Sequence, residues 1–217
     1  LKVGQFIRRE GPSSHIGKAG TGTMGGIGVI ITIIILTLIL INVDMDIKFL
    51  GLLFTFAGFA TLGAVDDLIK IKRRENEGLR PRHKFLIQVL LALAFGILLI
   101  LVAHNEEVGG VLKLFGFSSP WLYLPLTVFM IVGASNAANL TDGLDGMLSL
   151  VSAVAFLSYG IISYKLELMD PAIISIIAAG SLFAFLRFNF YPAQVFMGDI
   201  GSLSLGALLA CIAILIH

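Results

Sequence analysis

Charged residues are scarce in this 217-residue sequence. Asp, Glu, Lys and Arg make up 13% of it, hydrophobic residues make up 57%, and the mean hydropathy is +0.97. This balance excludes an ordinary soluble domain and predicts an integral protein of a lipid bilayer. There is one cysteine, Cys211, and it lies in an apolar run. A single cysteine excludes both a disulfide framework and a zinc site built from cysteines.

Charge is almost absent from seven runs that are long enough to cross a hydrocarbon core of ~30 Å as helices. These runs lack the alternation of apolar and polar residues that is typical of membrane barrel strands. The sequence therefore predicts an all-α fold, a polytopic transmembrane helical bundle. The predicted spans are residues 27–43, 48–65, 85–103, 120–135, 147–165, 171–187 and 201–216.

The basic residues are sorted by membrane side. If there are seven crossings, the segments 1–26, 66–84, 136–146 and 188–200 share one side. With Arg187 at their edge, they hold twelve of the fifteen Lys and Arg. The positive-inside rule places this side in the cytoplasm, and every cluster of polar residues with glycine lies there too. We therefore expect cytoplasmic chemistry, and nothing in this sorting predicts binding to nucleic acid.

Asp66 and Asp67 form an adjacent pair of carboxylates at the end of the second predicted span. Carboxylates close to the membrane cost free energy unless they are paired or bound to a metal. The pair could mark a helix end and bond to Lys70, one turn further on. Alternatively, it could hold a hard cation, since Mg²⁺ is commonly bound by carboxylates and substrate phosphates.

Two further cytoplasmic stretches carry carboxylates and asparagines. In NLTDGLDG, the residues Asn139, Asp142 and Asp145 recur every three positions, so a helical or turn-like backbone could point them the same way. A polar turn in which Asp142 or Asp145 is the N-cap of the next span explains this stretch equally well. The EF-hand ligand pattern is incomplete, which disfavours calcium. In FNFYPAQVFMGDIGSLSLG, beside Asn189, Asp199 could bind a metal, cap the seventh span, or do both.

Lysines and glycines add an anion-binding character to the same side. Lys18 lies in GPSSHIGKAGTGTMGG, a glycine-rich stretch before the first span, and such a stretch favours phosphate although it lacks Walker spacing. Lys70 and Lys84 flank a basic run that could anchor the loop to anionic lipid or face an anionic substrate. Together, these features predict Mg²⁺-assisted phosphoryl chemistry on a lipid substrate.

Five motifs in order resemble the polyprenyl-phosphate N-acetylhexosamine-1-phosphate transferases of glycosyltransferase family 4, and most closely their muramoyl-pentapeptide branch. The motifs are EGPSSHIGKAGTGTMGG, DDLIK, RHKFLIQ, NAANLTDGLDG and PAQVFMGDIGSLSLG. The resemblance implies transfer of phospho-MurNAc-pentapeptide from UDP-MurNAc-pentapeptide to undecaprenyl phosphate, giving lipid I and UMP. It implies Mg²⁺ as the cofactor and the bacterial inner membrane as the location, and it allows a homodimer.

The resemblance also implies roles for individual residues. Asp66, Asp67 and Asp199 would be catalytic, with Asp67 and Asp199 as metal ligands. Whether Asp66 or Asp67 acts as a base or as a covalent nucleophile stays open, although one-step attack by the lipid phosphate is simpler. The substrate-binding residues would be Lys18, Thr23, Lys70, Lys84, Asn139, Asp142, Asp145, Asn189 and Phe196, with Phe196 stacked on uracil.

Residues 1–217 are predicted to form a single domain with seven spans of an approximately ten-span fold. The resemblance implies an initial span before residue 1 and a histidine-rich loop with final helices after residue 217. Two alternatives remain open. The first is a sister transferase that uses UDP-N-acetylglucosamine. The second is a membrane transporter, since intramembrane carboxylates also mark ion paths, although no inverted repeat is visible.

Overall fold

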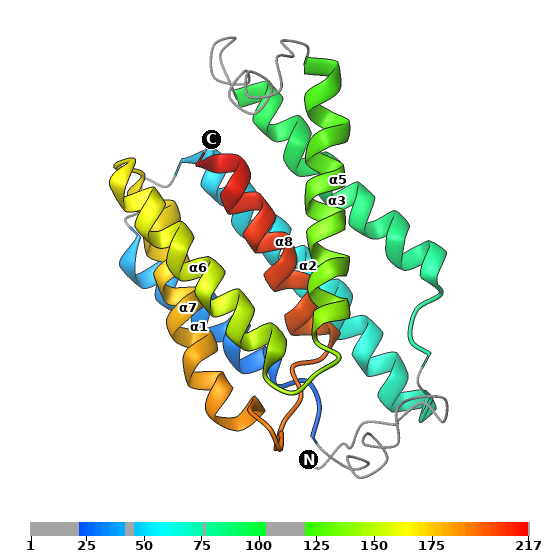
Figure 1. The fold of residues 1–217 in the computed structure, drawn as a ribbon. Coiled ribbons are helices and arrows are strands. Elements are labelled where there is room, and N and C mark those ends of the chain that lie inside the picture. The colour runs from blue at the N-terminus through cyan, green and yellow to red at the C-terminus, as the bar shows by residue number, and fades with distance from the viewer. Residues whose placement is uncertain (1–21, 42–45, 76, 103–119, 217) are drawn as a thin grey trace.

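The computed structural model describes residues 22–41, 46–75, 77–102 and 120–216, and these residues contain seven helices and one isolated bridge. The helices are α1 (Gly26–Leu40), α2 (Ile47–Arg73), α3 (Pro81–Val102), α5 (Pro120–Thr141), α6 (Met147–Lys165), α7 (Met169–Asn189) and α8 (Asp199–Leu215). Each predicted span corresponds to one of these helices. The predicted all-α polytopic bundle is confirmed (Figure 1).

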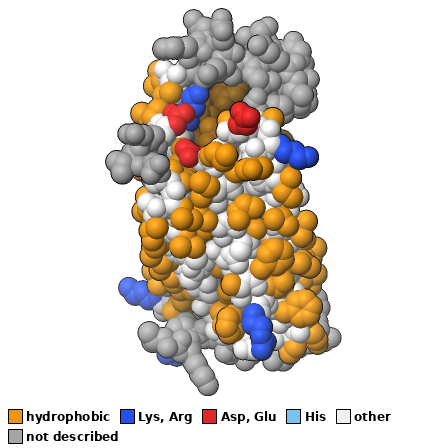
Figure 2. Space-filling model, turned by 90° about the vertical axis from the view of Figure 1, so that its left-hand side faces the viewer, with side chains coloured by type: hydrophobic (Ala, Val, Ile, Leu, Met, Phe, Trp, Pro, Cys, Tyr) orange, Lys and Arg blue, Asp and Glu red, His pale blue; other side chains and the backbone are white. Residues whose placement is uncertain are grey.

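The outer surface of the bundle is suited to lipid. Helices α2, α3, α5, α6 and α7 are long and apolar enough to cross a membrane, whereas α1 and α8 have 15 and 17 residues. Large apolar side chains point outward, among them Phe129, which is 74% exposed, and Leu101, which is 77% exposed. Figure 2 shows hydrophobic side chains over the middle of one face and charged side chains toward its two ends. A surface this apolar matches the acyl region of a bilayer, so the chain is a multi-pass membrane protein.

Helix α8 lies at the centre of the bundle (Figure 1), and most of its residues are buried. Small residues let it approach its neighbours closely. A Cβ atom added at Gly63 of α2 would overlap the backbone of Asp199, and one added at Gly206 of α8 would overlap the backbone of Ala134 in α5. Close backbone approach of this kind is how membrane helices gain packing energy without a hydrophobic driving force.

Two helices continue beyond their predicted spans. The apolar runs of α2 and α5 end near residues 65 and 135, but the helices continue to Arg73 and Thr141. Hydropathy marks where a helix leaves the apolar layer, whereas the hydrogen-bonded backbone continues into the polar region. These additional turns and the first turns of α3 and α8 lie at the same end of the bundle (Figure 1). They carry the polar residues of the candidate site.

The segment before α1 pairs with the segment before α8. The Phe196 N–H donates to Gly22 O at 2.8 Å, the Gly25 N–H donates to Phe196 O at 2.9 Å, and Gly22 forms a parallel bridge with Val195. This pairing ties the starts of two helices together. It also places the half-buried Thr23 beside the Phe196 backbone.

Candidate active site

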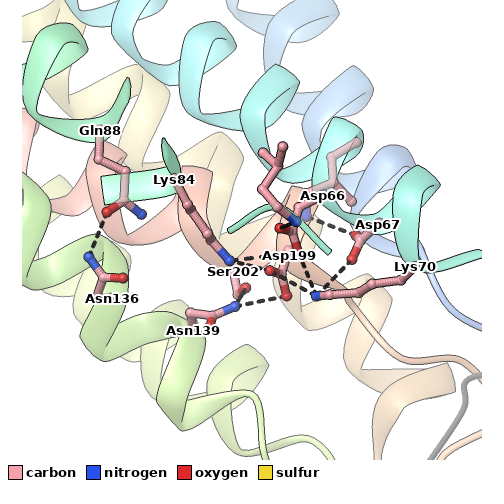
Figure 3. Close-up of polar contacts among 11 residues, drawn as sticks. Asp66, Asp67, Lys70, Lys84, Gln88, Asn136, Asn139, Asp199 and Ser202 are labelled. Carbon is pink, nitrogen blue, oxygen red and sulfur yellow. Dashed lines mark hydrogen bonds and ion pairs between the residues drawn. The ribbon is translucent and has the colours of Figure 1, made fainter. Parts of the chain in front are cut away.

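Three carboxylates meet at this end of the bundle (Figure 3). Asp66 and Asp67 come from α2 and Asp199 comes from the first residue of α8, and one oxygen of each lies within 4.8 Å of the others. Asp66 and Asp67 are only 2% and 4% exposed. Buried negative charges at this spacing repel one another, so the cluster is stable only with cations or protons among them.

Each of the three carboxylates has one oxygen held by a neutral donor. The donors are two backbone N–H groups and one side-chain amide. The bonds run from Leu79 N to Asp66 Oδ1 (2.8 Å), from Ile200 N to Asp67 Oδ2 (3.1 Å) and from Asn139 Nδ2 to Asp199 Oδ1 (3.0 Å). The second oxygen of each carboxylate is turned toward the middle of the cluster, where the ammonium groups lie. The carboxylates are thus oriented by neutral groups and offer three oxygens to cations.

Two lysines supply the cations in the cluster. Lys70 Nζ lies 2.7 Å from Asp66 Oδ2, 3.0 Å from Asp199 Oδ2 and 3.7 Å from Asp67 Oδ1. Lys84 Nζ lies 2.5 Å from Asp199 Oδ2 and 3.8 Å from Asp66 Oδ2. Two ammonium groups for three ionised carboxylates leave one formal negative charge. Asp67 Oδ1, which is farthest from Lys70, is the least compensated of the inward oxygens.

Glycines allow the backbone to approach these carboxylates. Gly198 has φ +80° and ψ 170°, a conformation that is essentially restricted to glycine. A Cβ atom at Gly198 would lie 2.6 Å from Asp67 Oδ2, and one at Gly78 would lie 2.5 Å from Asp66 Oδ1. Side chains at these two positions would displace the carboxylates from their anchored positions.

The simpler interpretations of these aspartates have different outcomes. The predicted ion pair of Asp66 with Lys70 is confirmed. The interpretation of Asp66 and Asp67 as a helix end is wrong, because α2 continues to Arg73. The physical reason is that the lysine and the backbone donors compensate the two charges within the helix, so the helix does not have to end there.

The N-cap interpretations are wrong as well. The cap of α8 is Gly198, which makes no side-chain cap bond, and Asp199 uses its oxygens on lysines and Asn139 instead. The cap of α6 is Gly146, not Asp142 or Asp145. Each of these carboxylates bonds instead to a group that is distant in the sequence.

Asp142 adds a fourth carboxylate near the cluster. It lies in the turn between α5 and α6 and is half-buried. Burial and, after it, the charges of Asp199 and Asp67 raise the pKa of its carboxyl group to about 8, against a hydrogen bond from the Gly198 backbone that lowers it. In the absence of a bound cation, Asp142 is therefore protonated at neutral pH.

Asp145 and Asn189 form a separate group that holds the segment between α7 and α8. Asp145 Oδ2 accepts from Ala193 N at 3.1 Å. Asn189 is 2% exposed; its Oδ1 accepts from Ser149 Oγ at 2.7 Å and its Nδ2 donates to Val195 O at 3.0 Å. These bonds shape the loop that carries the half-buried Phe196, so the two residues lie next to the site rather than in the carboxylate cluster. Their roles in substrate binding stay predictions.

Lys18 lies outside the described residues, so its predicted role also stays a prediction. Asn139, by contrast, lies at the centre of the site, where its Nδ2 bonds to Asp199 and also donates to Ser202 Oγ at 2.8 Å. Ser202 is buried on α8, one turn after Asp199. The structure thus brings together Asp66, Asp67, Lys70, Lys84, Asn139 and Asp199.

Sequence reasoning missed a second polar pair, Gln88 of α3 and Asn136 of α5. Asn136 Nδ2 donates to Gln88 Oε1 at 2.9 Å (Figure 3). Gln88 follows Lys84 by four residues and Asn136 precedes Asn139 by three, so each shares a helix face with a residue of the cluster. This spacing is the signal that could have identified the pair.

An apolar groove of about 800 Å³ opens between α3 and α5 beside this pair. Its walls are Phe85, Val89 and Leu93 of α3 and side chains of α5 from Leu124 to Asn136. A volume of this size is typical of small-molecule sites. The groove includes the exposed Phe129 and, as its polar side chain, Asn136.

The donors of the cluster fit a hard divalent cation. All three inward groups are carboxylate oxygens, which Mg²⁺ prefers, and they have excess negative charge in a buried place. Asp67 and Asp199, the predicted ligands, both belong to the set, and Asp66 is the third member. The arrangement combines charge neutralisation by lysines with oxygens for a metal, the combination that phosphoryl transfer requires.

Known proteins resemble the chain over nearly its whole length. Residues 49–217 match the family described as glycosyl transferase family 4. Phospho-N-acetylmuramoyl-pentapeptide-transferases of Bacillus pumilus (strain SAFR-032), Shouchella clausii (strain KSM-K16) and Bacillus subtilis (strain 168) are 45%, 43% and 42% identical to it. Each of these alignments covers 99% of this chain and 67% of the relative.

Proposed function

Since this chain belongs to glycosyl transferase family 4, we propose that it transfers phospho-MurNAc-pentapeptide from UDP-MurNAc-pentapeptide to undecaprenyl phosphate. The products are lipid I and UMP. At the coarser level, the chain is a membrane transferase related to enzymes named for transfer of a phospho-N-acetylmuramoyl-pentapeptide. The substrates, the product and the Mg²⁺ requirement are our proposal.

One observation carries the proposal. Three carboxylates, two of them buried and one partly buried, each have one anchored and one inward oxygen and share two lysines. An apolar groove ends nearby at Asn136, which precedes Asn139 of the cluster by three residues. Carboxylates held together against their mutual repulsion are unfavourable for stability and useful for binding a cation and phosphates. The groove beside them would admit a lipid carrier from the bilayer.

The proposed reaction is a single displacement at phosphorus. An oxygen of the lipid phosphate forms a bond to the β-phosphorus of the UDP-sugar while the bond from that phosphorus to the bridging oxygen breaks. The electron pair leaves with UMP. A phosphate monoester is already a nucleophile, so positioning and charge neutralisation supply most of the catalysis.

The residues of the cluster would divide this task. Lys70 and Lys84 lie where their ammonium groups can neutralise phosphate charge. Asn139 holds one oxygen of Asp199 and so fixes the other. When bound by Asp67 and Asp199, Mg²⁺ would neutralise charge on the diphosphate and orient it.

Asp66 and Asp67 are not equivalent in this proposal. Both oxygens of Asp66 are engaged at short distance, by Leu79 N at 2.8 Å and Lys70 Nζ at 2.7 Å. Asp67 keeps an oxygen whose nearest lysine nitrogen is 3.7 Å away. This difference favours Asp67 as the metal ligand or base and Asp66 as the residue that holds Lys70.

The nucleotide would lie on the side of the loop before α8. Asp142 borders the cluster, and Phe196 is held by Asp145 and Asn189 through the loop that these residues bond. Phe196 would stack on uracil, and Lys18 and Thr23 would contribute to substrate binding. We further propose that this end faces the cytoplasm of a bacterial inner membrane, because the segments at this end carry most of the basic residues.

UMP release by the full-length protein in detergent tests the proposal. The assay contains undecaprenyl phosphate and either UDP-MurNAc-pentapeptide or UDP-N-acetylglucosamine, with and without Mg²⁺. We expect release only with the muramoyl substrate and Mg²⁺. Release with UDP-N-acetylglucosamine would instead assign a sister reaction, and no release with either would contradict the proposed activity.

A further inference from the structure

Gln88 lies one helical turn after Lys84 on α3, and Asn136 lies about one turn before Asn139 on α5; Figure 3 shows this pair to one side of the carboxylate cluster. Asn136 Nδ2 donates both to Gln88 Oε1 at 2.9 Å and to Val132 O at 2.8 Å. A backbone carbonyl can only accept, so the Asn136 atom that faces Val132 must be the nitrogen. Gln88 must then present its oxygen to the same nitrogen, and the orientation of both amides is determined.

This determined orientation leaves Gln88 with an unusual cost. Its Nε2 is buried and has no partner among the residues that the structure describes, and the side chain is 1% exposed. A buried amide donor without a partner is unfavourable, and an apolar side chain of the same volume would remove it but leave an N–H of Asn136 unpartnered instead. Stability alone does not account for glutamine here, and departures of this kind are typical of functional sites.

The position of the pair relates it to the two residues that bind Asp199. Lys84 precedes Gln88 by four residues on α3, and Asn139 follows Asn136 by three on α5, so both pairs lie on the same helix faces. Lys84 bonds to Asp199 Oδ2 and Asn139 to Asp199 Oδ1. The Gln88–Asn136 bond therefore joins α3 to α5 about one turn away from the point where both helices reach Asp199.

We infer that Gln88 is a positioning residue of the phosphotransfer, because its oxygen locks the Asn136 carboxamide and sets the placement of Lys84 and Asn139 on Asp199. This inference rests on the proposed function. Both N–H groups of Asn136 are used by Gln88 and Val132, so Oδ1 is the atom that Asn136 offers to the groove it lines. Without Gln88, the carboxamide can rotate and α3 can shift against α5.

Two substitutions at the same position separate positioning from stability. Gln88→Met keeps the volume and removes the acceptor oxygen together with the unpartnered donor. We expect it to lower kcat about tenfold, as loss of one buried hydrogen bond predicts, with KM for both substrates within about twofold. The temperature of unfolding should stay near that of the parent protein, because one unpartnered donor replaces another.

Gln88→Glu keeps an acceptor oxygen for Asn136 but buries a carboxyl group. We expect a lower temperature of unfolding and a kcat within about threefold of the parent, so that the less stable variant is the more active one. Ser135→Ala is the matched control. Like Gln88→Met, it removes a buried, unpartnered polar group, here the Ser135 hydroxyl of α5. Ser135 lies on the side of α5 that packs against α8, so kcat should be unchanged.

The measurements are UMP release with both substrates and thermal unfolding, on the full-length protein in detergent. A Gln88→Met protein with the kcat of the parent would overturn the inference, as would activities that follow stability across the variants. If Gln88→Met does not fold, Asn136→Leu tests the same bond, since it removes the donor and offers no acceptor to a rotated Gln88 amide, and it should show the same loss of kcat. A parent that releases no UMP would overturn the proposed function and this inference with it.

Discussion

At the end of the bundle opposite the carboxylate cluster, Asp46 and Asp170 lie at helix starts. Asp46 is the N-cap of α2 and accepts from Lys48 N at 3.1 Å, and Asp170 lies in the first turn of α7. At the other end, none of Asp66, Asp67 and Asp199 caps its own helix. They bond to groups from other helices or distant loops, and Asp67 accepts from the Ile200 N–H in the first turn of α8. The same residue type thus stabilises its own helix at one end and assembles a site between helices at the other.

The difference lies in what the carboxylates do for the fold. A carboxylate at a helix start satisfies backbone donors and interacts favourably with the helix dipole, so its presence is explained by local structure. The clustered carboxylates need lysines to be tolerated at all. Carboxylates that join elements distant in the sequence and need counter-charges are the better indicators of function in this membrane protein.

The largest expected effect is a loss of turnover in variants of the carboxylate cluster that variants at the opposite end do not show. Asp67→Asn or Asp199→Asn should lower turnover by roughly 10³-fold, because each removes an inward charge while keeping the shape of the side chain. Asp46→Asn and Asp170→Asn are the matched controls and should stay within about twofold of the parent. UMP release measures all four variants. Near-normal turnover of Asp67→Asn or Asp199→Asn would contradict the catalytic role assigned to that residue.

A smaller loss is expected for the cations. Lys84→Met should lower turnover about 100-fold, because Asp199 Oδ2 loses its closest partner and a phosphate loses a neutralising charge. Lys165→Met changes a lysine at the opposite end of the bundle and should have no effect on the rate. Equal rates for the two variants would show that the charge of Lys84 is not used in the reaction.

The pH dependence of the free energy of unfolding tests whether burial and the neighbouring carboxylates raise the pKa of Asp142. Because the pKa of Asp142 is raised to about 8, the folded protein binds a proton that the unfolded chain has released between about pH 4 and 8. The free energy of unfolding of the metal-free protein should therefore fall as pH rises through this range. Asp142→Asn should remove this fall, so that the variant becomes the more stable protein above pH 8.

Thermal unfolding in EDTA between pH 5 and 9 measures this effect. Glu75→Gln, which changes an exposed carboxylate, is the control and should keep the pH dependence of the parent. Parallel curves for the parent and Asp142→Asn would contradict the raised pKa of Asp142.

The smallest effect belongs to the helix cap at the opposite end. Asp46→Ala should lower the free energy of unfolding by about 1 kcal/mol through loss of the bond to Lys48 N, with turnover per folded molecule unchanged. Thermal unfolding together with UMP release would check both parts. Loss of activity without loss of stability would mean that the two ends of the bundle are not independent.

Hydropathy was sufficient to predict the helices and the end at which polar residues gather. The apolar runs give the membrane crossings, and the alternate direction of successive helices brings residues 66–84, 136–146 and 188–200 together. What hydropathy could not predict is helix continuation past the apolar layer, because backbone hydrogen bonding does not depend on side-chain polarity. Asp66 and Asp67 therefore lie within a helix rather than at its end.

The details of the site depend on distant partners that a linear pattern does not contain. Asp145 and Asn189 were predicted to bind substrate, but their bonds in the structure go to Ala193, Ser149 and Val195, which shape a loop. Which oxygen of Asp67 is anchored depends on Ile200, 133 residues away. Gln88 is the last residue of the motif RHKFLIQ, but neither that motif nor its spacing from Lys84 shows that it pairs with Asn136 of another helix.

The central position of α8 has a consequence for the order in which the site is assembled during synthesis. Asp67 leaves the ribosome 133 residues ahead of Ile200, the residue whose backbone holds it. At ordinary synthesis rates of 5–20 residues per second, this interval lasts roughly 7 to 27 s. Within α2 itself, the charged partner of Asp66 and Asp67 is Lys70. The carboxylates of α2 and α8 therefore come together only after α8 has been synthesised.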